Sequence, residues 1–339
     1  MNLLITGGLG FIGSHVVELA LLQDWVGKVV NVDSQTYAGL LGNVDLGAMA
    51  KLYGKDIQEL SNRYVYQNLD VTDDRRTASL VRYHEITHCI HLAAETHVDR
   101  SILGPWAFMD TNVMGTASVS AACREYWQET PDAPHRFIQV STDEVFGSIG
   151  VSGGPFTEES RYNPSSPYSA SKAGADCLIM ALMKTYGFPA MITYGCNTFG
   201  PRQNSEKLIP KVVECLKKRE KIPIYGDGSQ IREWLHVDDH ATALIHLLIK
   251  GEPMERYCIG SANDWTNIQL VREICDIYDK LTDSEERSRG LISFVDDRPG
   301  HDQRYGVDAT KLLSTGWRRA KEIRKALEET VRWYIRRKS

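Results

Sequence analysis

Tyr168 and Lys172 are the residues whose types and spacing most directly indicate chemistry in this chain. They stand four positions apart, so on a helix the two side chains lie on one face, one turn from each other. An ammonium beside a phenol favours the phenolate and brings the ordinary pKa of about 10 toward the range that is useful for proton abstraction. We therefore predict that Tyr168 acts as a base and that Lys172 assists it.

Asp143 and Glu144 form a second candidate group, directly after Thr142 at the end of an expected strand. Two neighbouring carboxyl groups in a dry site titrate apart, so one can stay protonated near neutrality while the other is ionised. Such a pair can work as acid and base on the same substrate. Simpler interpretations are an exposed Asp-Glu pair in a loop and a threonine that only caps the strand end.

Gly7, Gly10 and Gly13 form a G-x-x-G-x-x-G loop between an expected strand and an expected helix. Glycines there allow a tight turn and a close approach of the backbone to a pyrophosphate at the positive helix N-terminus. Asp33 ends the next strand 20 residues later, where a carboxylate can bind an adenosine ribose and would repel a 2′-phosphate. We predict a dinucleotide site that prefers NAD to NADP, although a plain βα turn would share the glycines.

Two further strand ends, Asp70–Val71 and Leu92–Ala94, are expected to line the adenine pocket and the dinucleotide groove, unless they only end strands. The residues expected to contact NAD are Gly7, Gly10, Phe11, Ile12, Gly13, Asp33, Asp70, Val71, Leu92, Ala93, Ala94, Tyr168 and Lys172.

The first half of the chain alternates short β-rich runs with helical periodicity, which is the pattern of βαβ units. The expected strands are Leu3–Thr6, Val29–Val32, Val65–Gln67, Cys89–Leu92, Phe137–Val140 and Met191–Thr193. The expected helices are Ser14–Leu22, Arg75–Tyr83, Thr111–Tyr126 and Ser169–Tyr186. This order predicts an α/β fold, a doubly wound parallel sheet of the Rossmann type, with ligands at the carboxyl ends of its strands.

After about residue 190 the pattern becomes irregular, with Gly- and Pro-rich turns between shorter elements. We predict a dinucleotide-binding domain over 1–190 and a smaller substrate-binding lobe over 191–232 and 251–339. Residues 233–250 combine a short apolar strand with a helix that Asp238 and Asp239 begin, and we expect them to return to the first domain.

The composition excludes several other classes of protein. Lys and Arg number 39 against 44 Asp and Glu, a net charge of -5, whereas nucleic-acid binders normally carry a basic face. No stretch reaches the roughly 18 apolar residues of a membrane span, and the first residues lack the layout of a signal peptide, so we expect a cytoplasmic protein. Seven scattered cysteines without C-x-x-C spacing, and ten histidines without H-E-x-x-H, predict neither disulfides nor a metal site.

Nearly from end to end, the chain resembles the extended short-chain dehydrogenase/reductase family, and within it the dTDP-glucose 4,6-dehydratases. The segments that carry the resemblance, besides the glycine loop and the Tyr-Lys pair, are Val30–Asp33, Thr36–Gly39, Ala93–Ile102, Ser141–Val145, Glu206–Pro210, Ile231–Leu235 and Asp297–Asp302. The most specific element is Thr142-Asp143-Glu144, because related nucleotide-sugar epimerases are similar elsewhere but lack this paired acid and base.

The resemblance implies a hydro-lyase that converts a nucleotide-glucose, with dTDP-glucose favoured, to the 4-keto-6-deoxy sugar and water by transient reduction of NAD. It assigns Tyr168 to the C4 hydroxyl proton, with Thr142 beside it on the C4 oxygen. It assigns Glu144 as the C5 base and Asp143 as the acid that helps the C6 hydroxyl to leave. It also implies a homodimer that pairs the helices at 111–126 and 169–186.

The resemblance further supplies the substrate contacts. The two phosphate charges of a sugar nucleotide suit guanidinium groups. The implied residues are Thr96, His97, Thr142, Asn197, Glu206, Lys207, Leu208, Tyr225, Arg232, Asn267, Arg298 and His301. Phe146 stands where the family usually has tyrosine, and Cys196–Phe199 replaces the commoner Ser-Asn-Asn-Tyr, which leaves the exact sugar or base open.

Two other functions stay open at this point. A nucleotide-sugar epimerase or decarboxylase of the same fold would use NAD and Tyr168 but would not need Asp143 and Glu144. An idle NAD-binding sensor or scaffold would need no catalytic residue at all. The sequence also leaves dTDP and UDP undecided, because loop contacts hold the base.

Overall fold

A parallel sheet of seven strands, in the order β10-β6-β5-β4-β1-β2-β3, forms the centre of the protein. The structure is a computed structural model and describes residues 1–150, 153–297 and 301–337. The strands are β1 Asn2–Thr6, β2 Lys28–Asp33, β3 Tyr64–Asn68, β4 His88–His91, β5 Arg136–Thr142, β6 Ala190–Gly195 and β10 Arg256–Ile259. β4 and β6 are buried at every residue, as expected of parallel strands that are covered on both faces.

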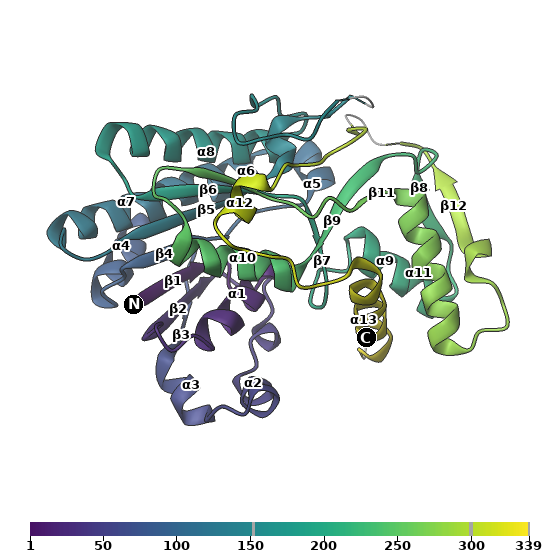
Figure 1. The fold of residues 1–339 in the computed structure, drawn as a ribbon, viewed down its shortest axis with the longest axis horizontal. Helices are drawn as coiled ribbons and strands as arrows, with labels where there is room; N and C mark the ends of the chain where they lie inside the picture. The colour runs from purple at the N-terminus through teal and green to yellow at the C-terminus, as the bar shows by residue number, and fades with distance from the viewer. Residues whose placement is uncertain (151–152, 298–300, 338–339) are drawn as a thin grey trace.

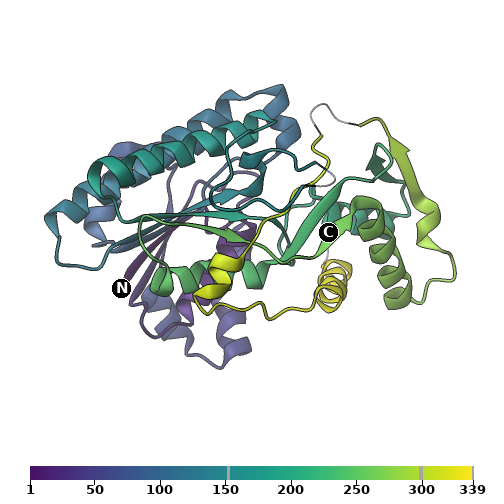
Figure 2. The ribbon, with the colours of Figure 1, turned by 45° about the horizontal axis from the view of Figure 1, so that its top comes forward.

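Helices cover both faces of this sheet (Figure 1). On one side α7 (Gly115–Glu129) packs between α4 (Asp74–Tyr83) and α8 (Pro167–Tyr186), and on the other α1 (Phe11–Leu21) packs against α10 (Val237–Lys250). The two groups stay on opposite sides of the sheet in Figure 2. The predicted doubly wound fold is therefore confirmed, and each expected strand and helix of the first half is present.

Local sequence signals fix where α8 begins and ends. The amide of Ser169 donates to Ser166 Oγ at 3.1 Å, and Pro167 occupies the first turn, where its missing N–H costs nothing. Gly187 ends the helix in the left-handed conformation at φ 62°. Tyr168 therefore stands in the first turn of α8, at the carboxyl edge of the sheet.

The helix expected at 111–126 begins differently from the prediction. Residues Met109–Met114 form a π-helix, η2, from which α7 continues. Asn112 in this turn accepts a hydrogen bond from the Glu95 amide at 2.8 Å and donates to Ser171 Oγ at 2.8 Å. Single π turns recur at functional sites, and this one joins the segment after β4 to α8.

A second, smaller lobe lies at the right of Figure 1 and has its own hydrophobic core, which includes Val212, Trp234, Ile274 and Val331. Its sheets contain β7 (Asn197–Phe199), β9 (Ile231–His236) and β11 (Asp264–Thr266), and separately β8 (Ile222–Tyr225) and β12 (Ile292–Val295). Its helices are α9 (Leu208–Lys218), α11 (Asn267–Thr282) and α13 (Ile323–Arg336). The remaining short elements are η1 Leu41–Asn43, α2 Leu46–Tyr53, α3 Ile57–Arg63, α5 Val98–Leu103, α6 Trp106–Phe108, η3 Asp143–Phe146, η4 Ser288–Leu291 and α12 Thr310–Ser314.

The chain crosses between the two lobes more than once. α10 packs on α1, and His15 Nδ1 lies 2.9 Å from Asp238 Oδ1. β10 pairs with β6 at the edge of the main sheet, although it belongs to the range 251–339 that we expected in the substrate lobe. The division into 1–190 with 233–250, against 191–232 and 251–339, stays a prediction. None of the helices within the described ranges is long and apolar enough to cross a membrane.

Candidate active site

The glycine loop between β1 and α1 leaves no room for side chains. A Cβ at Gly7 would lie 2.8 Å from the Ala93 amide nitrogen, and a Cβ at Gly13 would lie 2.1 Å from the Gly7 carbonyl oxygen. Gly7 also has a φ of 69°, which strains any residue with a side chain. Among the described residues, no side chain caps the N-terminus of α1, so its first amides are open to an anion. The loop fits a pyrophosphate.

Asp33 ends β2 beside this loop. Its carboxylate accepts hydrogen bonds from the amides of Leu9 at 3.0 Å and Gln35 at 2.9 Å. Burial raises the pKa of Asp33, and these two hydrogen bonds oppose the rise. A Cβ at Gly39 would lie 2.5 Å from Asp33 Oδ1, so the next loop also packs closely on this carboxylate. The groove between the glycine loop and Asp33 is suited to the adenosine end of a dinucleotide.

The other expected NAD contacts lie at the same edge of the sheet. Val71 is buried, and Leu92–Ala94, which follow β4, are partly exposed. Asp70 is exposed, and its carboxylate accepts hydrogen bonds from the amide and the hydroxyl of Thr72. Their contacts with NAD stay predictions.

Tyr168 and Lys172 are both buried on the face of α8 that packs against β5. Lys172 Nζ donates to the Val140 carbonyl at 2.8 Å. Burial raises the pKa of Tyr168, and the charges of Glu144 and Asp143 raise it further, while a hydrogen bond with Thr142 opposes them. Burial and the nearby carboxylates dominate here, and the lowering that we expected from Lys172, together with the charge of a nicotinamide, stays a prediction.

Thr142 joins the tyrosine to the two carboxyl groups. Its Oγ1 accepts from the Glu144 amide at 3.3 Å and lies 3.3 Å from Asp143 Oδ1, and it is also hydrogen-bonded to the Tyr168 phenol. Thr142 therefore caps η3, as the simpler interpretation held. It also contacts the phenol, so the capping role and the catalytic interpretation are compatible.

Asp143 is only 2% exposed, so the alternative of an exposed loop carboxylate is wrong for this residue. Its Oδ2 has no hydrogen-bond partner among the described residues. Burial raises the pKa of Asp143 well above its usual range, and the negative charges of Glu144 and Glu233 raise it further, whereas Arg232 lowers it. A carboxyl group that stays protonated next to a second carboxyl group is the arrangement that acid-base chemistry on one substrate needs.

A cavity of about 800 Å³ opens between the main domain and the smaller lobe, a size that suits a nucleotide-sized ligand. Most of the residues that we expected to bind substrate line it, from α5, β7, α9, β8, β9 and the segments around them. They are His97, Asn197, Glu206, Lys207, Leu208, Tyr225, Arg232, Asn267 and His301.

Arg232 lines this cavity, and its charge lowers the pKa of Asp143. It is buried, its guanidinium carbon lies 4.2 Å from the ring centre of Tyr305, and its Nη2 donates to the Asp302 carbonyl at 2.9 Å. Thr96 does not line the cavity; its carbonyl accepts from Lys207 Nζ at 3.1 Å. Arg298, the other expected phosphate ligand, lies outside the described residues.

The departures from the family pattern lie away from the cavity. Phe146 is buried, and its ring centre lies 4.7 Å from that of Tyr194 and 5.6 Å from that of Tyr162. Within the segment Cys196–Phe199, only Asn197 lines the cavity, and that residue matches the family pattern. Phe146, Cys196, Thr198 and Phe199 therefore lie outside the lining of the cavity.

Among the cavity residues that sequence reasoning missed are Tyr37 and Arg100. The guanidinium carbon of Arg100 lies 3.9 Å from the ring centre of Tyr37, and its Nη2 lies 3.7 Å from Glu206 Oε2. The hydroxyl of Tyr37 donates to Glu206 Oε1 at 3.4 Å. Both residues belong to segments quoted for the resemblance, but only the fold brings them to the smaller lobe.

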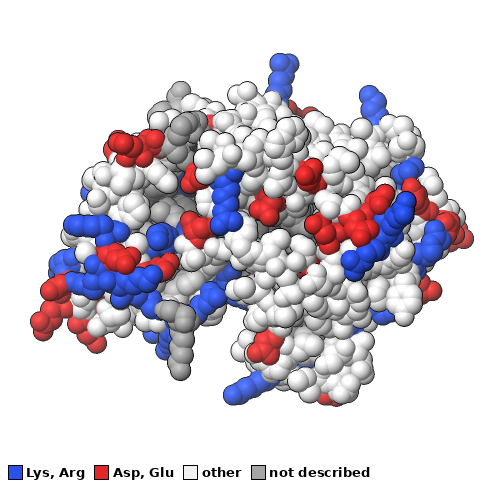
Figure 3. Space-filling model, turned by 180° about the vertical axis from the view of Figure 1, so that it is seen from behind, with Lys and Arg blue, Asp and Glu red and all other residues white. Residues whose placement is uncertain are grey.

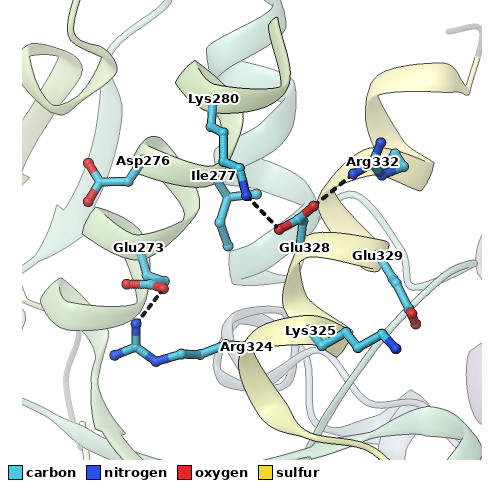
Figure 4. Close-up of a pocket in the computed structure, with 9 residues that line it drawn as sticks. All are labelled: Glu273, Asp276, Ile277, Lys280, Arg324, Lys325, Glu328, Glu329 and Arg332. Carbon is cyan, nitrogen blue, oxygen red and sulfur yellow. Dashed lines mark hydrogen bonds and ion pairs between the residues drawn. The ribbon is translucent and has the colours of Figure 1, made fainter.

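A second hollow, of about 790 Å³, lies between α11 and α13 and contains none of the expected site residues. Its acidic and basic side chains pair across the two helices, as between Arg324 and Glu273 at 3.0 Å and between Lys280 and Glu328 at 3.3 Å (Figure 4). Basic and acidic side chains are likewise interspersed over the face shown in Figure 3. We therefore take the cavity lined by Arg232 as the candidate substrate site, although Thr142, Asp143, Glu144 and Tyr168 are not among its lining residues.

A sequence profile of the family described as GDP-mannose 4,6 dehydratase matches residues 4–330. The chain belongs to this family. The matched residues span both lobes. This match and the relatives below confirm the resemblance to the extended short-chain dehydrogenase/reductases that the motifs indicated.

Individual proteins are similar to this chain over nearly its whole length. The dTDP-glucose 4,6-dehydratase of Shigella flexneri is 41% identical over 347 residues, which cover 99% of this chain and 93% of the relative. The structure of a dTDP-glucose 4,6-dehydratase from Streptomyces venezuelae, with NAD and TYD bound, has a TM-score of 0.86 and 37% identity and covers 99% of this chain and 97% of that one. A UDP-glucose 4-epimerase from Thermotoga maritima, with a TM-score of 0.83, 24% identity and 99% coverage of both chains, shares the fold.

Proposed function

We propose that this chain is an NAD-dependent dTDP-glucose 4,6-dehydratase, a hydro-lyase that forms a 4-keto-6-deoxy sugar and water. The observation that carries the proposal is the buried carboxyl group of Asp143 next to Glu144, joined through Thr142 to Tyr168. An epimerase of the same fold has no use for this pair. The identity of 41% to an enzyme of that name supports the same assignment.

The glycine loop and the end of β2 would hold the cofactor. Gly7, Gly10 and Gly13 would admit the pyrophosphate, and Asp33 would bind the adenosine ribose, as the close contacts at the loop and the amides around the carboxylate support. NAD bound there would supply reversible removal of a hydride. The similar structure from Streptomyces venezuelae, solved with NAD bound, supports this assignment.

Tyr168 would take the proton of the C4 hydroxyl while that carbon is oxidised. Its raised pKa means that the phenolate needs support, and Lys172 in the next turn of α8 is placed to provide it once the site binds its ligands. Thr142, hydrogen-bonded to the phenol, would hold the C4 oxygen beside the base.

The C4 ketone makes the C5 proton acidic, and the two carboxyl groups would then remove water across C5 and C6. Glu144 would take the C5 proton, and Asp143 would donate a proton to the departing C6 hydroxyl. The buried position of Asp143 favours the protonated form of this carboxyl group. After water leaves, a hydride enters at C6 and a proton at C5, which restores the redox state of the sugar.

Label transfer tests this function. The chain is incubated with dTDP-[4-²H]glucose and, separately, with UDP-[4-²H]glucose, and the products are identified by NMR and mass spectrometry. A dehydratase of the proposed kind moves deuterium from C4 to C6 of a 4-keto-6-deoxy product and takes the C5 proton from water. Faster turnover of the dTDP sugar would support thymidine as the nucleoside of the substrate. Faster turnover of the UDP sugar would show that the nucleoside is uridine.

The same experiment separates the other functions. An epimerase leaves the label at C4 and inverts that carbon, and an idle scaffold returns the sugar unchanged. Either result would overturn the dehydratase assignment.

We also propose that the chain forms a homodimer and works in the cytoplasm. Met109 and Met114 on η2 are 41% and 59% exposed, and exposed apolar side chains on one helical segment favour association. Seven cysteines without disulfide spacing are typical of a reducing compartment.

A further inference from the structure

Asp176 occupies the third position of the helix face that carries Tyr168 and Lys172. The three residues stand four positions apart on α8, and the Asp176 side chain is fully buried. Nothing in the proposed reaction uses it. A buried carboxylate is costly unless a charge or hydrogen bonds compensate it, so its presence beside the site needs a physical reason.

The surroundings of Asp176 favour an ordered and ionised carboxylate. Ser141 Oγ donates to Asp176 Oδ2 at 2.5 Å, and the Tyr162 hydroxyl donates to the same oxygen at 3.4 Å. The Tyr162 and Tyr194 hydroxyls are themselves hydrogen-bonded at 2.6 Å, which orients the first of them. Burial raises the pKa of Asp176 to about 6, with Lys172 as the largest opposing influence, so the group is ionised above neutral pH.

Lys172 is the cation nearest to this carboxylate on the helix. Burial disfavours its charged form too, but within the part of the chain that the structure describes no anionic partner contacts it directly. Its Nζ donates to the Val140 carbonyl, which carries no net charge, and among the described residues no carboxylate oxygen lies within 4.0 Å of it. Burial lowers the pKa of Lys172, and the charge of Asp176 opposes that change. Asp176 thus acts on Lys172 through space, without a direct ion pair.

We propose that Asp176 is a positioning residue that keeps Lys172 protonated, so that Lys172 can stabilise the phenolate of Tyr168. This inference rests on the proposed function, in which Tyr168 works as a base. Without the charge of Asp176, the Lys172 ammonium is left in a medium of low dielectric constant and loses its proton at a lower pH. Activity then falls first at the alkaline end of the pH profile.

Other ionisable groups surround the pair. They are His91 on β4, Tyr162 before α8, Cys177 on α8, Tyr194 on β6 and Arg256 on β10, with Asp143 and Glu144 at the Tyr168 end. Burial lowers the pKa of the imidazole to about 3 and raises the pKa values of the two phenols and the thiol, so these groups stay neutral. The guanidinium, hydrogen-bonded to Tyr194, has a raised pKa and stays charged. The alkaline limb of kcat therefore reports on Lys172 together with Asp143, the acid of the proposed reaction, and the NMR titration isolates Lys172.

Asp176→Asn tests the proposal, because it removes the charge and keeps the size of the side chain. The full chain is labelled with [ε-¹³C]lysine, loaded with NAD and titrated by NMR, and the Lys172 signal is assigned by its loss in Lys172→Met. The midpoint of Lys172 should fall by about 1 pH unit in D176N, and the alkaline limb of kcat should move by the same amount. Asp176→Glu, which keeps the charge, should restore both toward the wild type.

Asp279→Asn is the matched control. Asp279 is also a buried carboxylate held by a serine, Ser288, whose amide donates to it at 3.0 Å, but it lies on α11 in the smaller lobe. D279N should leave the Lys172 midpoint and the alkaline limb where the wild type has them.

Three results would decide against the proposal. They are an unchanged Lys172 midpoint in folded D176N, a fall of kcat that is equal at every pH, and an equal shift in D279N. If D176N does not fold, Asp176→Ser, which is smaller and still polar, takes its place with the same expected shift. A wild-type chain that turns over no nucleotide-glucose would sink the proposed function alone, since the midpoints are measured without substrate.

Discussion

The amide of Leu9 donates to Asp33 Oδ2 at 3.0 Å, which ties the glycine loop to the acid at the end of β2. A carboxylate fixed in this place repels a 2′-phosphate, so the chain stripped of cofactor should bind NAD at least about tenfold more tightly than NADP, a difference of about 1.4 kcal/mol. Asp33→Asn should narrow the difference, and Asp45→Asn, whose carboxylate caps α2 instead, should not. Calorimetric titration measures both, and tighter binding of NADP by the wild type would contradict the assignment.

Removal of the phenol should stop the first chemical step. Tyr168→Phe keeps the ring packed against Phe108 but has no proton acceptor, so kcat should fall by roughly 10²- to 10⁴-fold. Substrate affinity should change little, because no binding contact is assigned to that oxygen alone. Steady-state kinetics and equilibrium binding together check this, and near wild-type turnover would remove Tyr168 from the mechanism.

Variants of Glu144 and Asp143 should block two different steps of the reaction. Glu144→Gln should still oxidise C4 but stall before water leaves, so absorbance of reduced cofactor should build up in a single turnover. Asp143→Asn should slow the loss of water while exchange of the C5 proton with solvent stays measurable. If both variants fail before any reduced cofactor appears, the division of labour between the two residues is wrong.

The burial of Asp143 should also appear in the pH dependence of stability. Its pKa is raised in the folded chain, so the folded state holds this proton more tightly than the unfolded state does. The contribution of Asp143 to stability is thus greatest below the unfolded pKa of about 3.9 and is lost as the pH rises through the folded value. Asp143→Asn lacks this loss, so its Tm relative to the wild type should increase with pH. Thermal unfolding from acid to alkaline pH measures this difference in Tm, and a difference that stays constant with pH would contradict the raised pKa.

Association should depend on the helices that begin at η2 and α8. Met114→Glu places a charge on the exposed apolar surface there and should convert a dimer into a monomer in light scattering after gel filtration. Leu52→Glu, on α2 and 71% exposed, makes the same change elsewhere and should leave the dimer intact. A wild-type monomer at micromolar concentration would exclude the proposed assembly.

The sequence predicts those parts of the fold and the site that depend on residues close together in the chain. β-rich runs and helical periodicity define β1 to β6 and the helices between them, because burial on both faces demands continuous apolar strands. The glycine loop and the Tyr168–Lys172 pair are likewise visible, since their spacing is fixed within a few residues. The Thr142 to Glu144 group is visible for the same reason.

Long-range contacts account for what could not be predicted. Tyr37 meets Glu206 across 169 positions, and Asn112 meets Ser171 across 59, so no local pattern contains either contact. The rise in the pKa of Tyr168 could not be predicted for the same reason: it depends on how deeply the phenol is buried and how close Glu144 and Asp143 come in the fold. The contribution of β10 to the main sheet was also hidden, because the smaller lobe interrupts the βαβ rhythm before it.

The pairing of β10 with β6 also determines when the central sheet can be completed during synthesis of the chain. β6 is complete at residue 195, but its outer edge stays without its neighbour until residue 259 has left the ribosome. An exposed strand edge is a template for wrong pairing, so the nascent chain passes through a period in which its largest sheet can aggregate. A fragment that ends between these points would keep the glycine loop and the Tyr168 helix and still expose that edge. Cofactor binding by such a fragment would therefore come with a tendency to self-associate that the whole chain lacks.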